Sequence, residues 1–240
     1  VTSPPYGQLR DYRGFQFDFE RIANQLWRVT KSGGVVVWVV GDETVEGGES
    51  GVSFRQALYF MSLGFRLHDT MIYMKSGPSY PSKDKYYQVF EYMFVLSKDK
   101  PMTFHPLQDR ENRWFGQKWS KVRTRRNAAG ELKRTVWHAD EGKQFGTRFN
   151  IWQYAVGHGN HGDAFAHEHP ASFPEPLALD HILSWSNVGD VVLDPMMGSG
   201  TTGKMAINAQ RKFIGIDIAP DYVGLTKERI LNTTCQLSLI

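Results

Sequence analysis

The 240-residue chain has a single cysteine, Cys235, which excludes an internal disulfide framework and any zinc site built from several cysteines. Long apolar runs are also missing. The longest uncharged one, Val35–Val40, is far too short to span a bilayer, and no N-terminal signal peptide is visible. With 41% hydrophobic and 22% charged residues, the composition excludes general disorder. These absences predict a globular, cytoplasmic protein with no membrane partner.

The whole chain has no strong excess of positive or negative charge, but one part of it does. The 28 Lys/Arg and 25 Asp/Glu residues give a net charge of +3. Residues 100–150 hold twelve Lys/Arg and five Asp/Glu, a net +7, which leaves −4 for the remainder. Tryptophan and phenylalanine are interleaved with these charges, which are densest at Lys121–Arg126. The pattern favours a polyanion-binding lobe, although a solvated basic loop has the same composition.

Outside this region, helical and strand patterns alternate. Helical spacing is present in Asp18–Lys31, and a continuous apolar run, Val35–Val40, is typical of a strand buried on both faces. This alternation predicts an α/β fold with a mainly parallel sheet, and the weakly periodic residues 99–165 predict an inserted lobe. Further helices are expected around 54–64, 174–185, 201–210 and 220–231, with strands at 65–74, 89–97, 190–194 and 212–217.

A glycine-rich loop, Gly198-Ser199-Gly200-Thr201-Thr202-Gly203-Lys204, joins an expected strand to an expected helix. It fits G-x-G-x-x-G, in which glycines let the backbone turn tightly and approach a ligand at a helix N-terminus. It also approaches the P-loop pattern, but Met205 replaces the hydroxyl residue that would hold magnesium. Asp217 ends the next strand, where an acid can accept hydrogen bonds from both hydroxyls of a ribose. The loop therefore predicts a ligand that contains adenosine.

The position of this loop near the C-terminus helps to decide which cofactor it binds. A dinucleotide dehydrogenase opens with such a loop, whereas here only thirty-six residues follow Lys204. The rest of the sheet must come from residues before the loop, so its strands are assembled in permuted order. A P-loop or dinucleotide-binding enzyme using Gly198–Lys204 remains the alternative.

The chain begins Val1-Thr2-Ser3-Pro4-Pro5-Tyr6. Two prolines cannot continue a sheet ladder, so we expect a rigid segment just past a strand end. It offers a hydroxyl, the Pro4 carbonyl and an aromatic ring, a set that suits an exocyclic amine on a planar base. Read alone, the motif favours a proline-rich terminus or turn with no such role.

Taken together, Ser-Pro-Pro-Tyr, the basic lobe, the segment from His169 to Pro174 and the stretch from Asp194 to Thr202 resemble one family. This is the β group of S-adenosylmethionine-dependent DNA amino-methyltransferases. The resemblance spans nearly the whole chain except the lobe. It implies a Rossmann-like methyltransferase sheet in permuted order with an inserted target-recognition lobe. The expected parts are a catalytic half at 1–98, the lobe at 99–165 and a cofactor-binding half at 166–240.

The resemblance also implies roles for individual residues. Ser3 and the Pro4 carbonyl would hold the amine of a base flipped out of duplex DNA, and Tyr6 would stack on that base. Transfer would be direct, without a nucleophilic cysteine, since Cys235 is expected beyond the last helix. The implied catalytic residues are Ser3, Pro4, Pro5 and Tyr6. The implied cofactor-binding residues are Asp194, Pro195, Gly198, Ser199, Gly200, Thr201, Asp217, Phe173, Pro174, Ala171 and His169. The DNA-binding candidates are Lys121, Arg123, Arg125 and Arg126, for phosphate or guanine contacts.

The cofactor is S-adenosyl-L-methionine and the main partner is double-stranded DNA. A homodimer and a cognate restriction endonuclease are the further partners considered, in a prokaryotic or phage-encoded cytoplasmic system. Ser3 in place of aspartate at the first motif position favours cytosine N4 over adenine N6. Methylation of RNA or of a protein glutamine amide by a related motif is a further alternative.

Two features of the sequence weigh on this interpretation. A family member should have a strand leading into the Ser-Pro-Pro-Tyr motif, but only Val1 and Thr2 precede it. We therefore expect the natural chain to extend before Val1, and without such a strand a catalytically inactive DNA-binding relative is the alternative. Four histidines crowd residues 158–169, but no cysteine is near and His169 belongs to the cofactor segment, so no metal site is predicted.

Overall fold

The computed structural model describes residues 1–5, 17–77, 85–113, 115–116, 119–139, 143–155 and 174–237. The chain forms two compact units, one of residues 1–105 and 150–240 and the other of residues 106–149. The elements are, in chain order, α1 (Phe19–Val29), β1 (Val35–Val40), β2 (Thr44–Val45), β3 (Gly48–Glu49), α2 (Val52–Ser62), β4 (Arg66–Lys75), β5 (Phe90–Ser97), β6 (Arg110–Glu111), β7 (Trp119–Arg126), β8 (Leu132–Ala139), β9 (Phe145–Gly146), β10 (Ile151–Tyr154), α3 (Glu175–Trp185), β11 (Val191–Asp194), α4 (Thr201–Asn208), β12 (Lys212–Gly215) and α5 (Pro220–Leu237).

The larger unit is built on a four-stranded sheet in the order β1-β5-β4-β10. Strands β1 and β4 each pair with β5 in antiparallel fashion, and β10 pairs with β4 in parallel. Strands β1, β4 and β10 thus run in one direction, as the expected mainly parallel sheet requires, and β5 runs against them. Antiparallel neighbours need no crossover connection, unlike parallel strands, and β5 is the next strand after β4 along the chain.

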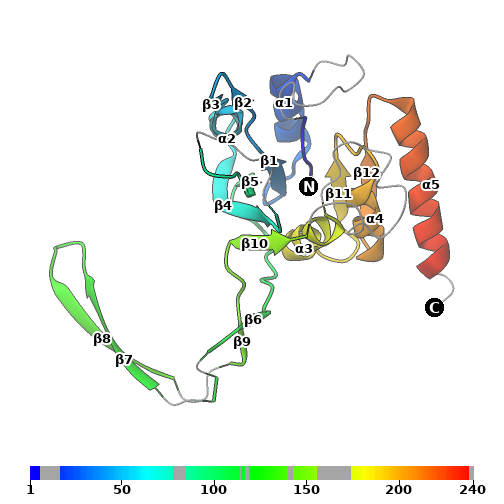
Figure 1. Cartoon of the computed structure of the whole chain (residues 1–240). Helices are drawn as coiled ribbons and strands as arrows, with labels where there is room; N and C mark the ends of the chain where they lie inside the picture. The colour runs from blue at the N-terminus through cyan, green and yellow to red at the C-terminus, as the bar shows by residue number, and fades with distance from the viewer. Residues whose placement is uncertain are drawn as a thin grey trace. The chain divides into compact units, whose positions relative to one another are not determined.

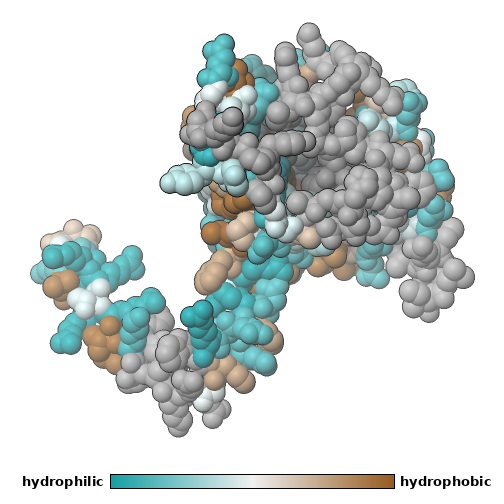
Figure 2. Space-filling model, in the orientation of Figure 1, coloured by the Kyte–Doolittle hydropathy of each residue, from teal (hydrophilic) through white to brown (hydrophobic). Residues whose placement is uncertain are grey.

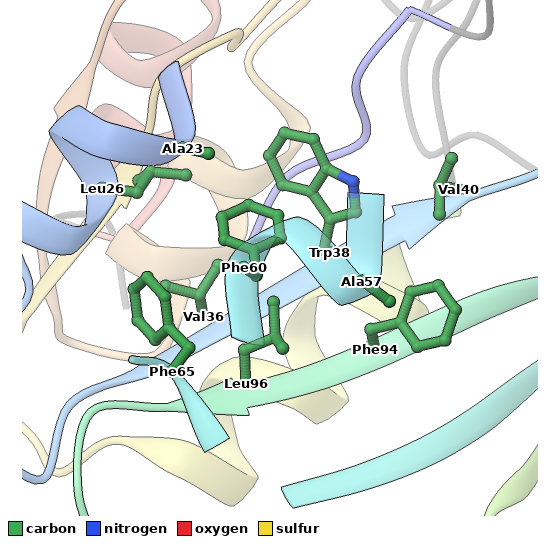
Figure 3. Packing of buried hydrophobic residues seen from close by; sticks show 10 residues of the cluster. All are labelled: Ala23, Leu26, Val36, Trp38, Val40, Ala57, Phe60, Phe65, Phe94 and Leu96. Carbon is green, nitrogen blue, oxygen red and sulfur yellow. The ribbon is translucent and has the colours of Figure 1, made fainter. Parts of the chain in front are cut away.

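The core of this unit covers one face of β1 (Figure 3). Trp38 and Phe60 are fully buried and meet edge to face, with ring centroids 5.1 Å apart. The indole N–H of Trp38 donates to Gln56 Oε1 at 2.8 Å, so the buried polar atom of this large apolar side chain is satisfied. This packing fixes helices α1 and α2 against β1 and rigidifies the strand that leads to the site described below.

Strands β11 and β12 form a parallel pair that carries helices α3, α4 and α5 (Figure 1). Buried residues of α3, α4 and β11 form a second apolar cluster, to which Ala178, Ile182, Val192, Met205 and Ala206 belong. This is a β-α-β unit, in which the glycine-rich loop connects β11 to α4 as the sequence predicts.

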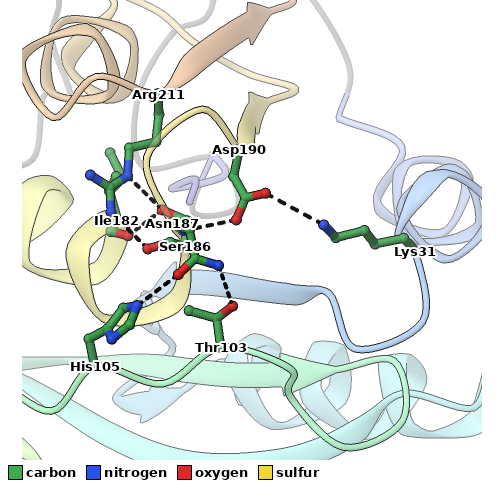
Figure 4. Close-up of polar contacts among 8 residues, drawn as sticks. All are labelled: Lys31, Thr103, His105, Ile182, Ser186, Asn187, Asp190 and Arg211. Atoms are coloured by element: carbon green, nitrogen blue, oxygen red, sulfur yellow. Dashed lines mark hydrogen bonds and ion pairs between the residues drawn. The ribbon is translucent and has the colours of Figure 1, made fainter.

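Polar contacts join distant segments of the larger unit behind this layer (Figure 4). The Asn187 side chain bonds Thr103 and His105, and Asp190 accepts the Asn187 backbone N–H at 2.8 Å. Arg211 donates to the Ser186 carbonyl at 2.7 Å. The loop between α3 and β11 is therefore held from both sides.

The smaller unit consists of two antiparallel pairs, β6 with β9 and β7 with β8. Arg148 forms an ion pair with Asp109, and this hydrogen-bonded guanidinium lowers the pKa of the Asp109 carboxyl. The compact unit at 106–149 lies within the expected lobe at 99–165. It is shorter than that lobe because β10 joins the main sheet and His105 bonds Ser184 in the larger unit.

Some elements differ from expectation. Helix α5 continues to Leu237, six residues past its expected end, so Cys235 lies within the last helix rather than beyond it. Among the described residues, no helix is long and apolar enough to cross a membrane. In the same part of the chain, no three metal-binding side chains come together, and the four histidines of 158–169 lie outside it.

Candidate active site

The first residues of the chain lie between the two groups of strands. Thr2 forms a parallel bridge with Trp38, in which its N–H donates to the Val37 carbonyl at 3.1 Å and its carbonyl accepts from Val39 N–H at 3.0 Å. On the other side, the Val1 nitrogen donates to the Leu193 carbonyl of β11 at 3.4 Å. Thr2 thus occupies the position where the sequence predicts a strand leading into the Ser-Pro-Pro motif.

A side-chain hydrogen bond fixes this segment to the glycine-rich loop. Thr2 Oγ1 donates to Asp194 Oδ1 at 2.7 Å, and both residues are buried, with 2% of each exposed. Ser3 and Pro5, which follow Thr2, are half-buried, and Pro4 is buried. The contact brings the Ser-Pro-Pro motif beside the end of β11, although the two are 192 residues apart in sequence.

Asp194 is held by the loop that it begins. Its Oδ1 also accepts the Met196 N–H at 3.1 Å. Burial raises the pKa of the Asp194 carboxyl, and the hydrogen bonds from Thr2 and Met196 act in the opposite direction by favouring the charged form. Pro195 follows directly in the turn that leaves the strand. Asp194 is therefore a buried residue that hydrogen-bonds both the N-terminal segment and the start of the loop.

The loop itself needs glycine at two positions. Gly198 and Gly200 have φ of 48° and 78°, in the left-handed region that side chains disfavour. A Cβ on Gly200 would lie 2.6 Å from the Thr226 methyl group. The conformation turns the chain sharply, so that Thr201 opens helix α4 and the buried Ser199 lies just before it.

The acid predicted to bind a ribose lies against this loop. Asp217 follows β12, and its Oδ2 accepts the Gly198 N–H at 2.9 Å while its Oδ1 accepts the Ala219 N–H at 2.9 Å. An ionised carboxylate has about four acceptor sites, so each oxygen keeps a further site for a hydroxyl group. The fixed carboxylate beside a glycine loop fits the adenosyl part of S-adenosylmethionine.

A buried charged cluster behind the loop was missed by sequence reasoning. Arg229 of α5 is 1% exposed and donates to the Ser199 carbonyl at 2.8 Å and to Thr201 Oγ1 at 3.2 Å. Its other nitrogen donates to Glu175 Oε1 at 2.7 Å, and the same oxygen accepts from Lys204 Nζ at 2.8 Å. Lys204 therefore points to Glu175, which gives it a structural partner rather than the phosphate of a P-loop.

A signal for this cluster exists in the sequence. Thr226, Arg229 and Thr233 lie on one side of α5 by their i, i+3, i+7 spacing, and all three are buried. Thr226 Oγ1 donates to the Gly198 carbonyl at 2.9 Å. A polar stripe on a helix that packs beside a ligand loop is a sign that the helix supports the loop.

The Asp42 carboxylate, which follows β1, accepts from the backbone and hydroxyl of Ser53 and from Ser50, so it holds the start of α2. The other sequence candidates fall in different places. Pro174 is buried at the N-cap of α3. Tyr6, His169, Ala171 and Phe173 lie outside the described residues. Lys121, Arg123, Arg125 and Arg126 belong to β7 in the smaller unit, and their side chains are exposed.

A strand-loop-helix with a fixed carboxylate and an adjoining Ser-Pro-Pro segment is the arrangement expected for a methyltransferase of the DNA-modifying class. Residues 1–228 match the N6_N4_Mtase DNA methylase family model, and the chain belongs to this family. The cofactor of the family is S-adenosylmethionine, and the reaction is methylation of DNA. The interpretation of Gly198–Lys204 as a P-loop or dinucleotide site is therefore wrong.

Individual proteins are similar to this chain in sequence or in fold. The chain is 55% identical over 235 residues to the orphan methyltransferase M.BamHII of Bacillus amyloliquefaciens, covering 97% of this chain and 88% of that one. Its fold is similar to that of the PvuII DNA methyltransferase (cytosine-N4-specific), with a TM-score of 0.64, 19% identity and coverage of 95% and 77%. It is also similar to M1.HpyAVI in complex with S-adenosylmethionine, with a TM-score of 0.60, 20% identity and coverage of 95% and 86%.

Proposed function

We propose that this chain moves a methyl group from S-adenosylmethionine to the exocyclic amine of a base flipped out of duplex DNA, with cytosine N4 as the target. The observation that carries the proposal is the 2.7 Å hydrogen bond from Thr2 to Asp194, which brings the Ser-Pro-Pro motif beside the cofactor loop. An amine held by the first would then meet the methyl group held by the second. Such positioning is a large part of the rate enhancement in a two-substrate reaction.

The cofactor-binding residues are proposed from the loop outward. Asp217 accepts hydrogen bonds from the ribose hydroxyls, and the loop from Asp194 and Pro195 through Gly198, Ser199, Gly200 and Thr201 surrounds the rest of the cofactor. The support is the fixed Asp217 carboxylate and the left-handed glycines of the loop. His169, Ala171, Phe173 and Pro174 are proposed for the opposite side, on the resemblance alone.

The chemistry at the target base is proposed for Ser3, Pro4, Pro5 and Tyr6. The Ser3 hydroxyl and the Pro4 carbonyl accept hydrogen bonds from the amine, which directs the nitrogen lone pair away from them. Pro5 fixes the backbone that follows the Pro4 carbonyl, because its ring restricts φ, and Tyr6 stacks on the flipped base. Bound S-adenosylmethionine supplies an electrophilic methyl group at which that lone pair is directed.

The choice of base rests on one residue. Ser3, at the first position of the motif, favours cytosine N4 in the family that the chain resembles. The matching family model includes both N6 and N4 enzymes, so adenine N6 is the second candidate. Both amines are paired in a duplex, and either base has to be flipped before it can react.

One experiment tests activity and base together. The protein is incubated with isotopically labelled S-adenosylmethionine and mixed-sequence duplex DNA, with RNA and protein acceptors in parallel reactions. The nucleic acids are digested to nucleosides, and all products are analysed by mass spectrometry. We expect label in N4-methyl-2′-deoxycytidine from the DNA. Label in N6-methyl-2′-deoxyadenosine would overturn the base assignment, and label only in an RNA or protein acceptor would overturn the substrate. No label in any acceptor would support the inactive DNA-binding alternative.

Two variants test the residue roles. Ser3→Ala and Tyr6→Ala should reduce methyl transfer by about a hundredfold or more, since they remove positioning of the base, and should leave binding of S-adenosylhomocysteine unchanged. Calorimetric titration with S-adenosylhomocysteine provides the control. If either variant loses cofactor binding, its residue belongs to the cofactor site instead.

The proposal extends to partners other than DNA. A homodimer and a cognate restriction endonuclease are the two partners considered besides DNA, and the relative at 55% identity is named as an orphan methyltransferase. Sedimentation of the purified protein with and without a DNA duplex tests the dimer.

A further inference from the structure

The two-stranded ribbon formed by β7 and β8 has two chemically different faces. Side chains alternate along each strand, and residues directly opposite each other share a face. The pairings Lys121↔Trp137, Arg123↔Thr135 and Arg125↔Lys133 define one face. We call the positions Lys121, Arg123, Arg125, Lys133 and Thr135 the basic face. The other positions, Val122, Thr124, Arg126, Leu132, Arg134 and Val136, form the mixed face.

The basic face concentrates like charges in a way that disfavours the isolated ribbon. Arg125 lies directly opposite Lys133, and like charges at such a position repel each other. Arg123 and Lys121 follow on the same face at two-residue intervals, and these four side chains are all exposed. Folding alone gives no reason for this arrangement, whereas a polyanion lying along the face would turn the repulsion into attraction.

The mixed face has a different character. Val122 and Val136 pair directly across it and are 48% and 53% exposed, and Leu132 near the turn is 62% exposed. None of its three cross-strand pairs places two cations opposite each other. The Arg126 guanidinium donates to the Gly130 carbonyl at 2.9 Å, so it stabilises the turn between the strands. Figure 2 shows brown apolar residues among the teal ones on this ribbon.

We propose that the ribbon enters the major groove of duplex DNA with its basic face toward the DNA and its mixed face turned away. A major groove about 12 Å wide admits a two-stranded ribbon. Residues two apart on a strand repeat every ~6.6 Å, which is close to two base-pair steps of about 3.4 Å. Lys121, Arg123 and Arg125 can therefore follow successive groups of one DNA strand. This inference rests on the proposed function and specifies how that enzyme holds its substrate.

The proposal changes the set of DNA-contacting residues that the sequence suggests. Lys133 joins it, because it shares the face of Arg125 although it lies on the other strand. Arg126 leaves it, because its side chain belongs to the mixed face and to the turn. Neither change can be seen without the register of the ribbon.

The test compares two double variants that remove the same charge from the same end of the ribbon. Arg125→Gln/Lys133→Gln alters the basic face, and Arg126→Gln/Arg134→Gln alters the mixed face. Binding of a fluorescein-labelled, mixed-sequence DNA duplex is measured by anisotropy between about 50 and 200 mM salt. Thermal unfolding without DNA checks the fold, and removal of like-charge repulsion should leave the basic-face variant at least as stable as the unmodified protein.

We expect the basic-face variant to bind DNA roughly tenfold or more weakly, with the slope of log K against log salt reduced by about 1.8, since each phosphate contact contributes about 0.9. The mixed-face variant should keep that slope and bind within about threefold of the unmodified protein. Equal losses in the two variants, or a larger loss in the mixed-face variant, would overturn the proposal. Absence of methyl transfer by the unmodified protein would overturn the proposed function instead, because the binding comparison does not require catalysis.

Discussion

Thr2 joins the two halves of the candidate site through a single hydroxyl group. Thr2→Val keeps the shape of the side chain but leaves the buried Asp194 carboxylate without its 2.7 Å donor. We expect a loss of about 1–3 kcal/mol in the free energy of unfolding, as for a buried acceptor that loses its partner. Because the Ser-Pro-Pro motif would also lose its anchor, kcat should fall about tenfold or more while KM for the cofactor changes little. Urea unfolding and steady-state methyl transfer measure the two effects.

Thr2→Ser is the matched control, since it restores the donor without the methyl group. It should recover most of kcat. A Thr2→Val variant that is less stable but has unchanged kcat would show that Thr2 only supports the fold.

Arg229 is a second single residue that supports the glycine-rich loop, through its hydrogen bond to the Ser199 carbonyl. Arg229→Leu leaves the Ser199 carbonyl and the Glu175 carboxylate without this donor, and breaking a buried charge pair in this way costs about 3–5 kcal/mol. We expect lower stability and also weaker binding of S-adenosylhomocysteine, since the loop loses its support. Calorimetric titration measures the affinity.

Lys204→Met provides the comparison for Arg229, because Lys204 bonds the same Glu175 oxygen at 2.8 Å. It should lower stability and change cofactor affinity less than Arg229→Leu does. Equal losses of affinity would assign the effect to Glu175 rather than to support of the loop.

The residues that could be predicted from the sequence are those inside local motifs. Gly198, Gly200 and Asp217 follow from a strand-loop-helix pattern and its next strand, and the structure brings them together. The bonds of Thr2 to Asp194 and of Arg229 to Glu175 cross 192 and 54 residues, and no local spacing encodes such pairs. The sequence therefore predicts the candidate ligand-binding residues but not the long-range hydrogen bonds that hold them in place.

At the scale of single elements, we expect glycine-to-alanine substitutions in helices α4 and α5 to have opposite effects on stability. Alanine normally stabilises a helix relative to glycine by about 0.8–1 kcal/mol. In α4, however, a Cβ at Gly203 would lie 2.6 Å from the Phe213 ring, so Gly203→Ala should destabilise the protein by about 1–3 kcal/mol through overpacking. In α5, nothing lies within 4 Å of a Cβ at Gly224, and Gly224→Ala should stabilise it.

Chemical unfolding of both variants, with a Gly203→Ala/Phe213→Leu double variant, checks this difference. Phe213→Leu removes the ring that clashes, so the double variant should be less destabilised than the sum of its parts. Strict additivity would mean that Phe213 is not the obstacle.

Elements with an apolar signal were predictable, and elements without one were not. Val35–Val40 is the strand that its continuous apolar run predicts, because both of its faces are buried. Strands β7 and β8 have no buried face at residues 121–126 and 132–136, so they lack an apolar signal, although Lys121, Arg123 and Arg125 alternate with Val122 and Thr124. The end of α5 was placed too early for the same reason, as its last turns carry no apolar stripe.

At the scale of the whole chain, the larger unit depends on contacts between segments from its beginning, middle and end. Asp190 pairs with Lys31, whose ammonium lies 3.7 Å away, and accepts the Asn187 N–H, while the Asn187 side chain bonds Thr103. Figure 4 shows these residues converging from separate segments. The Asp190 carboxylate therefore belongs to a network that joins the segments of Lys31, Thr103 and Asn187, and its titration should affect the stability of that network.

This arrangement makes the acid stability of the protein testable. The Asn187 N–H and, to a smaller extent, Lys31 and Arg211 lower the pKa of Asp190. A carboxylate with a lowered pKa in the folded state contributes stability above its unfolded value of about 3.9, and this contribution is lost as pH falls through the folded pKa. Asp190→Asn should therefore be less stable than the unmodified protein at neutral pH, and the difference should shrink as pH falls below about 3.9 and through the lowered folded-state pKa. Urea unfolding across this pH range measures it. Lys31→Met should retain most of the pH-dependent contribution, because the backbone hydrogen bond is the larger cause; if it abolishes that contribution, the ion pair rather than the Asn187 N–H holds the pKa down.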